Sequence, residues 1–186
     1  MRIGLSVPNA KAEGETLVDA VRVVEMAALT PPPVDGAELL ALNDFTGLPP
    51  GAFTPERFGQ SGKWTLGYGP HAQFDVLAAG NEGRPALHVV SGPGEYAALG
   101  VLPKARLQRG GLYRVTITAR GQASLSLNFW AIPWGLTPVR HWDLTDEWKT
   151  YSLDFFIDTD AEAPAVPVVG VTGEAWLDRM EMKVAG

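Results

Sequence analysis

The chain has 186 residues, 46% of them hydrophobic, and a formal net charge of -6 at pH 7. This length fits one domain with a substantial core, and a charged fraction of only 19% argues against a disordered chain. Because no run of Lys and Arg is present, nucleic acid is not an expected partner, and the absence of cysteine excludes disulfides and thiolate chemistry.

The chain begins with MRIGLSVPNAKAEG, which contains no apolar core of the length that a signal peptide needs. No apolar run elsewhere is long enough to cross a membrane. We therefore expect synthesis in the cytoplasm without an export signal, and no membrane partner.

Residues 1–36 are predicted to form an N-terminal arm. Residues 2–7 have the pattern of a short strand that ends at Pro8. Residues 16–29 fit two structures: Thr16 and Asp19 have capping-box spacing, which favours a helix, whereas the segment VRVVEM favours a strand. We favour the helix and leave the strand open. The segment TPPPVDG at residues 30–36 ends the arm.

From residue 37 onward, short segments with strand patterns alternate with turn residues. The candidate strands are residues 37–45, 64–67, 73–78, 86–90, 96–102, 113–120, 124–132, 151–158, 166–171 and 174–184. Many short strands with almost no helix predict an all-β fold. We expect an antiparallel jelly-roll β-sandwich over residues 37–186, with the arm as an extension.

The clearest alternation lies between Gly111 and Asp158, in three segments that each place apolar side chains on one face. The predicted inward set is Tyr113, Val115, Ile117, Ala119, Leu125, Leu127, Phe129, Ala131, Tyr151, Leu153, Phe155 and Ile157. The opposite face is mostly polar, as expected for half-buried antiparallel strands.

Trp130 is unusual because it lies in the polar phase of its segment, together with Asn128. A large aromatic side chain there suits a platform for a sugar ring, and it equally suits a contact with the arm or with another subunit. The following loop adds Trp134, Arg140 and Trp142, a combination typical of ligand or protein interfaces. The alternative is that Trp142 plugs one end of the sandwich. These five residues form the predicted binding site.

Short motifs follow one another in a characteristic order. They are Asn43-Asp44-Phe45, Trp64, Ala86-Leu87-His88-Val89, Gly111-Leu112-Tyr113 leading to Ala119-Arg120, Trp148-Lys149-Thr150-Tyr151, and Ala175-Trp176-Leu177-Asp178. This order resembles jelly-roll carbohydrate-binding modules of the galactose-binding-like fold, over about four-fifths of the chain. The resemblance implies a β-sandwich whose concave sheet face and loops carry sugar contacts.

Asp178 shares its alternation phase with Trp176, Met180 and Met182, so we expect it to point toward the core. A buried carboxylate needs a partner. In the resembling modules an acidic residue at this place joins backbone carbonyls around a structural calcium, and Glu38 or Asp44 could add oxygen ligands. An arginine partner, or an exit of the strand into solvent, would also explain Asp178.

No catalytic pattern is present. Residues 92–97 match the G-x-G-x-x-A spacing of dinucleotide-binding proteins, but the next segment has a strand pattern where that motif requires a helix. We predict a hairpin turn there. His71, His88 and His141 are scattered and lack the spacing of a zinc site. The protein is not expected to be an enzyme.

Three functions remain, in order of preference. The first is a non-catalytic structural module of a large assembly, such as a capsid decoration or tail protein of a bacteriophage, with other protein subunits as partners. The second is a carbohydrate-binding module that recognises a glycan through exposed Trp residues. The third is an accessory domain of a glycoside hydrolase.

Overall fold

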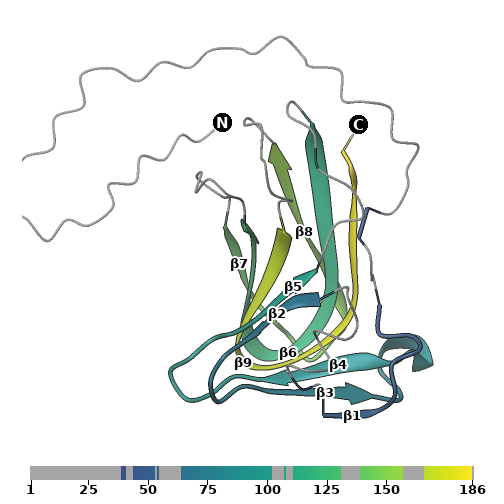
Figure 1. Ribbon diagram of the computed structural model, residues 1–186, viewed down its shortest axis with the longest axis vertical. Coiled ribbons are helices and arrows are strands. Elements are labelled where there is room, and N and C mark those ends of the chain that lie inside the picture. The colour runs from purple at the N-terminus through teal and green to yellow at the C-terminus, as the bar shows by residue number, and fades with distance from the viewer. Residues whose placement is uncertain are drawn as a thin grey trace, which may run out of the picture.

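The computed structural model describes residues 39–40, 44–52, 54, 64–101, 107, 111–130, 139–156 and 166–185, and only the backbone of residues 64–68 and of Trp130. The predicted arm at residues 1–36 therefore lies outside the described residues, as do Glu38 and Trp134. Within them the fold is antiparallel β-structure with a single short helical turn (Figure 1), which confirms the expected fold class.

The described part contains nine strands and one 3₁₀ turn. They are β1 (Gly51–Ala52), β2 (Trp64–Tyr68), β3 (Gln73–Leu77), η1 (Asn81–Gly83), β4 (Ala86–Val90), β5 (Ala97–Val101), β6 (Leu112–Trp130), β7 (Arg140–Asp143), β8 (Lys149–Phe156) and β9 (Val166–Val184).

Two long strands, β6 and β9, form the centre of the fold. They pair with each other over nearly their whole length, from Tyr113 opposite Val184 to Trp130 opposite Val166. The sequence patterns predicted two separate strands on each stretch, and that prediction was wrong. Each long strand instead bends near its middle, at Gly121 and at Gly173, whose φ angles are +144° and +115°. Both angles lie in the region that favours glycine.

On each side of the β6–β9 pair, two shorter strands replace one long neighbour, one before the bend and one after it. On one side, β8 pairs with the first half of β6, and β7 pairs with the second half. On the other side, β4 and β5 pair with successive stretches of β9. The segment between β4 and β5 is therefore a corner, and the predicted hairpin at residues 92–97 was wrong. We use the term corner for this bend, where residues 91–96 and 144–148 interrupt the two flanking paths.

The bend folds the sheet into two facing layers, seen side by side above the bend in Figure 1. Phe155 on β8 shows that the layers close on each other, because it contacts residues from both ends of β6. Its ring centroid lies 3.5 Å from that of Phe129 and 5.4 Å from that of Tyr113. From the corner, β4, β3 and β1 extend the sheet across the bottom of the view.

The core lies between the layers. Its largest fully buried side chains include Leu40, Leu87, Leu99, Leu125, Leu127, Leu177 and Met182. The described members of the predicted inward set on β6 and β8 are buried, apart from Tyr151, which is half-buried against the core, and this confirms the alternation. Burial of a large aliphatic side chain contributes about 1.5–3 kcal/mol, so this core is the main source of stability.

Candidate functional site

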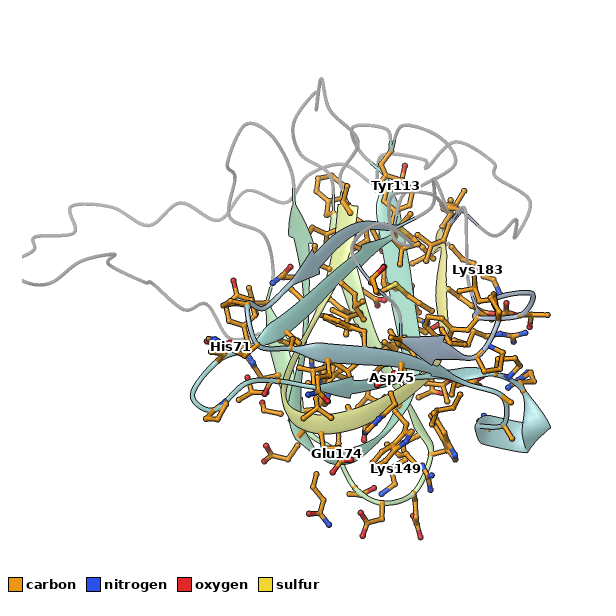
Figure 2. The ribbon with its side chains drawn as sticks, turned by 60° about the horizontal axis from the view of Figure 1, so that its bottom comes forward. His71, Asp75, Tyr113, Lys149, Glu174 and Lys183 are labelled. Carbon is orange, nitrogen blue, oxygen red and sulfur yellow. The ribbon has the colours of Figure 1, made fainter. Side chains whose placement is uncertain are left out.

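The outer surface of the corner carries a row of polar and aromatic side chains. Arg120 on β6 pairs with Trp176 on β9, Trp176 pairs with His88 on β4, and His88 pairs with Asp75 on β3. Directly opposed residues of antiparallel strands share a face, so these four side chains lie side by side across about 14 Å of sheet. Figure 2 turns this end of the molecule forward and labels Asp75 within the row and Glu174 beside it.

Four flat side-chain groups form a stack. Three of them, from His88, Trp176 and Arg120, belong to this row, and the fourth is the indole of Trp148 in the segment 144–148. The rings of His88 and Trp176 are stacked, with centroids 4.8 Å apart and planes inclined by 18°. The Arg120 guanidinium carbon lies 5.1 Å from the Trp176 ring and 5.2 Å from the Trp148 ring. Cation–π contacts of this kind contribute about 0.5–2 kcal/mol each, so the stack holds Arg120 in place.

Trp148 reaches the stack because of the corner. The segment 144–148 joins β7 to β8, and two hydrogen bonds fix it to β6: Leu144 N–H donates to Ala123 O over 2.9 Å, and Gly121 N–H donates to Thr145 O over 2.9 Å. Trp148 then sits half-buried just before β8 begins. Among the described residues, Arg120 is the one cation that lies over the Trp148 ring.

A cavity of about 200 Å³ opens beside this stack and is lined by Arg120, Gly121, Asp146 and Trp176. Its volume is far larger than one water molecule requires. The cavity combines one cation, one carboxylate and an indole. Such a mixture suits a ligand that has apolar ring faces and several hydroxyl groups.

The other end of the stack is tied down by a charge pair. His88 Nε2 lies 2.8 Å from Glu174 Oε1, and both groups are partly exposed. Glu174 lies two residues before Trp176 on β9. Its contact with His88 therefore holds the His88 ring against the neighbouring ring of Trp176. We name Arg120, Trp148, Trp176, His88 and Asp146 the corner site.

The sequence-predicted site residues are split between two faces. Trp142 pairs with Leu125, and Arg140 pairs with Leu127. Because both leucines face the core, Trp142 and Arg140 share the inner side of β7, where Trp142 is half-buried against the core. Arg140 is exposed and lies 5.3 Å from the Trp142 ring. This geometry matches the alternative in which Trp142 closes one end of the sandwich.

Asn128 lies on the opposite, outer face, where it pairs with Val168. Trp130 is the last residue of β6 and pairs with Val166, and its side chain lies outside the described residues, as does Trp134. The structure therefore brings Arg140 and Trp142 together and places Asn128 on the other face. Ligand binding by any of these residues stays a prediction.

Asp178 is fully buried, as predicted, and it is the extra residue of a β-bulge. Thr118 pairs with Arg179 and Ala119 with Leu177, which leaves Asp178 without a partner in β6. Its Oδ2 accepts hydrogen bonds from Arg84 Nη2 at 2.8 Å and from Asn81 Nδ2 at 3.0 Å. The arginine partner considered from the sequence is thus present.

The bulge corrects one expectation, because it changes the alternation phase of β9. Leu177 faces the core before the bulge and Met180 after it, so Trp176 lies on the outer face and not in the phase of Met180. A bulge commonly redirects a side chain in this way. Calcium at Asp178 stays a prediction. The Arg84 cation beside the carboxylate works against it, and no group of three His, Asp or Glu side chains suited to a metal occurs in the part of the chain described here.

Sequence reasoning did not identify the corner site. Arg120, Trp148 and Trp176 all belong to the motifs that carry the family resemblance, but the motifs alone indicated fold. The available signal was the number of Trp and Arg residues in those motifs. The register that places them together comes only from the pairing of β6, β9 and β4.

Comparisons with known proteins identify the fold. No protein-family model matches the sequence, and no curated protein matches it. A cyclase from Fischerella sp. TAU in complex with 4-(1H-indol-3-yl)butan-2-one matches 81% of this chain and 99% of its own, with a TM-score of 0.57 at 12% identity. The family 22 carbohydrate-binding and GH10 modules of a Clostridium thermocellum xylanase, complexed with xylohexaose, match 81% of this chain with a TM-score of 0.53 at 13% identity.

A family 29 carbohydrate-binding module matches 81% of this chain and 91% of its own, with a TM-score of 0.50 at 16% identity. The enzymatically active domain of a tailspike protein from bacteriophage CBA120 matches 66% of this chain, with a TM-score of 0.50 at 11% identity. This chain spans 28% of the xylanase chain and 19% of the tailspike chain. The described residues therefore have the β-sandwich fold of carbohydrate-binding modules, as the sequence resemblance predicted. No helix within those residues is both long and apolar enough to cross a membrane.

Proposed function

We propose that this protein is a non-catalytic glycan-binding module and that the corner site holds the sugar. One observation carries the proposal: the Arg120 guanidinium is fixed between two indole rings at the mouth of a cavity of about 200 Å³. The likeness in fold to carbohydrate-binding modules supports the same function without assigning the site.

The parts of the corner site have separate roles in this proposal. In this proposal the indole of Trp148 supports a sugar ring, whose C–H face packs against it. Arg120 donates hydrogen bonds to ring and hydroxyl oxygens, and Asp146 accepts hydrogen bonds from hydroxyl groups. The stack and the loop hydrogen bonds hold these groups before the ligand arrives, which lowers the entropic cost of binding.

The proposal is tested by replacing Trp148 with alanine. Retention of the protein on a panel of neutral and acidic polysaccharides is compared with that of the Trp148→Ala variant. We expect the variant to bind at least about tenfold more weakly, because loss of a stacking ring in a half-desolvated site costs on the order of 1.4 kcal/mol or more. Trp148 is half-buried at a strand end, so circular dichroism should show an intact fold.

Phe156→Ala is the matched control. Phe156 is also an aromatic residue of the β8 region, it is 41% exposed, and it lies at the far end of the strand from Trp148. The control should retain full binding. Loss of binding in Phe156→Ala with full binding in Trp148→Ala would move the site away from the corner, and no retention of the parent protein on any glycan would refute the proposed function.

A second candidate function is a structural module of a bacteriophage particle, in contact with other protein subunits. The likeness to the tailspike domain favours it. The two functions are compatible, because a virion protein can hold host-surface glycans through the corner site. Copurification of this chain with phage particles supports the second candidate, and its recovery only as a free monomer speaks against it.

A further inference from the structure

Arg120 differs from most other arginines in the described residues. Arg84, Arg114 and Arg179 each form an ion pair with a carboxylate, at 2.8, 2.6 and 3.3 Å respectively. The side chain of Arg120 forms no ion pair and no hydrogen bond with the described part of the chain, although the protein carries an excess of six negative charges. A guanidinium has five N–H donors; the Nε–H of Arg120 is buried, so a ligand can use the four on its two Nη atoms.

The Nε of Arg120 is buried and has no hydrogen-bond partner among the described residues, as is also true of the Nε atoms of Arg84 and Arg179. Arg120 differs from these two because its Nη atoms have no carboxylate partner in the described part of the chain. Trp148 and Trp176 cover the guanidinium at 5.2 and 5.1 Å, so ligand atoms reach it along its edge. The edge of a guanidinium presents two parallel N–H groups, which match the two oxygens of a carboxylate.

Arg140, which also lacks an ion pair in the described residues, serves as a contrast. It is exposed on β7, lies over the ring of Trp142, and is close enough to Asp154 to help lower the pKa of that carboxyl group. A water-exposed guanidinium gains little from an added carboxylate, whereas the partly desolvated Arg120 gains more because its field is less screened.

We propose that the glycan bound at the corner site is acidic and that Arg120 binds the carboxylate of a uronic acid residue. This inference rests on the proposed function and names its ligand class. Asp146 lines the same cavity on an exposed loop, where it accepts hydroxyl hydrogen bonds. Because Arg120 and Asp146 line one pocket, the site favours a sugar that carries both a carboxylate and hydroxyl groups over a simple anion.

The test uses a matched pair of ligands, hexagalacturonic acid and its fully methyl-esterified form, measured by isothermal titration calorimetry. Esterification removes the charge and keeps the sugar rings. We expect the free acid to bind roughly ten- to hundredfold more tightly, the range expected for hydrogen bonds to charged groups. The preference should weaken as salt concentration rises.

Three variants assign the effect to Arg120. Arg120→Gln should remove the preference for the free acid, and Arg120→Lys should keep part of it, because lysine retains the charge and loses the two-point geometry. Arg114→Gln is the matched control, since Arg114 is exposed and already paired with Asp154, and it should keep the full preference. Thermal unfolding confirms that each variant is folded.

The outcomes separate the two proposals. Equal binding of both hexamers, with binding still lost in Trp148→Ala, overturns the acidic ligand and leaves the glycan-binding function intact. A preference that survives in Arg120→Gln also overturns the inference. Binding of a sulfated oligosaccharide with none of the carboxylate form overturns it as well. Failure of every glycan to bind refutes both proposals together.

Discussion

Tyr151 shows how the environment of a single residue sets its chemistry. It pairs with Ile117 on the inner side of β8, and its ring lies 5.5 Å from that of Trp142. Its hydroxyl is buried and has no hydrogen-bond partner among the described residues. Burial disfavours the phenolate and raises the pKa of Tyr151 above its usual value near 10.

This raised pKa predicts a loss of stability at alkaline pH. In the unfolded chain Tyr151 ionises near pH 10, whereas in the folded chain it keeps its proton to higher pH, so the free energy of unfolding falls as pH rises from about 10 toward the folded pKa. Tyr151→Phe should lose less stability over this range. At pH 7 the variant should be equally stable or up to about 1 kcal/mol more stable, because a buried unpaired hydroxyl is removed.

Urea unfolding of the parent and the Tyr151→Phe variant at pH 7, 9, 10 and 11 measures the difference. Parallel stability curves over the whole range would show that the Tyr151 hydroxyl is not desolvated in the folded protein.

Single residues also mark where the sequence was and was not informative. The burial of Asp178 was predictable, because the residues two positions before and after it, Trp176 and Met180, are apolar. Its partner was named only as one of three explanations, since Arg84 is far away in the sequence. The outward position of Trp176 could not be predicted, because a bulge leaves no signature in a pattern of alternating residues.

At the scale of elements, the corner depends on the glycines in β6 and β9. A Cβ at Gly121 would lie 2.2 Å from Glu174 O, and one at Gly173 would lie 2.5 Å from Gln122 O. Each glycine therefore allows the backbone of the other strand to approach closely. The alternation of β6 continues without a break from Ala119 to Leu125, and for that reason the sequence could have been interpreted as one bent strand.

Gly121→Ala tests this account of the corner. The substitution combines an unfavourable φ with a clash against backbone atoms, and we expect a loss of about 3–5 kcal/mol in the free energy of unfolding. Gly94→Ala is the control, because Gly94 has a φ of +72° and no heavy atom within 4 Å of the added Cβ. It should lose only about 1–2 kcal/mol.

Chemical unfolding of both variants separates backbone strain from the clash. If Gly121→Ala is no less stable than Gly94→Ala, then the close approach of β6 and β9 does not limit the bend.

For the whole molecule, the sequence predicted the architecture and the burial pattern, and both followed from local alternation along each strand. The proposed corner site was not predicted, because it depends on long-range pairing. Arg120, Trp148, Trp176 and His88 come from four separate segments, and only the register of β6, β9 and β4 brings them together. The predicted Trp-rich loop is a local feature of the sequence; in its described part Trp142 packs against the core, and ligand binding by this loop stays a prediction.

The most direct measurement of the central claim is the nuclear magnetic resonance spectrum of the tryptophan indole N–H groups during titration with hexagalacturonic acid. The chain has six tryptophans, so each signal can be assigned by substitution. Binding at the corner site predicts shifts for Trp148 and Trp176 and an unchanged signal for Trp142, which lies on the inner face of the sheet. A saturable shift of Trp142, with Trp148 and Trp176 unchanged, would contradict the assignment of the corner as the binding site.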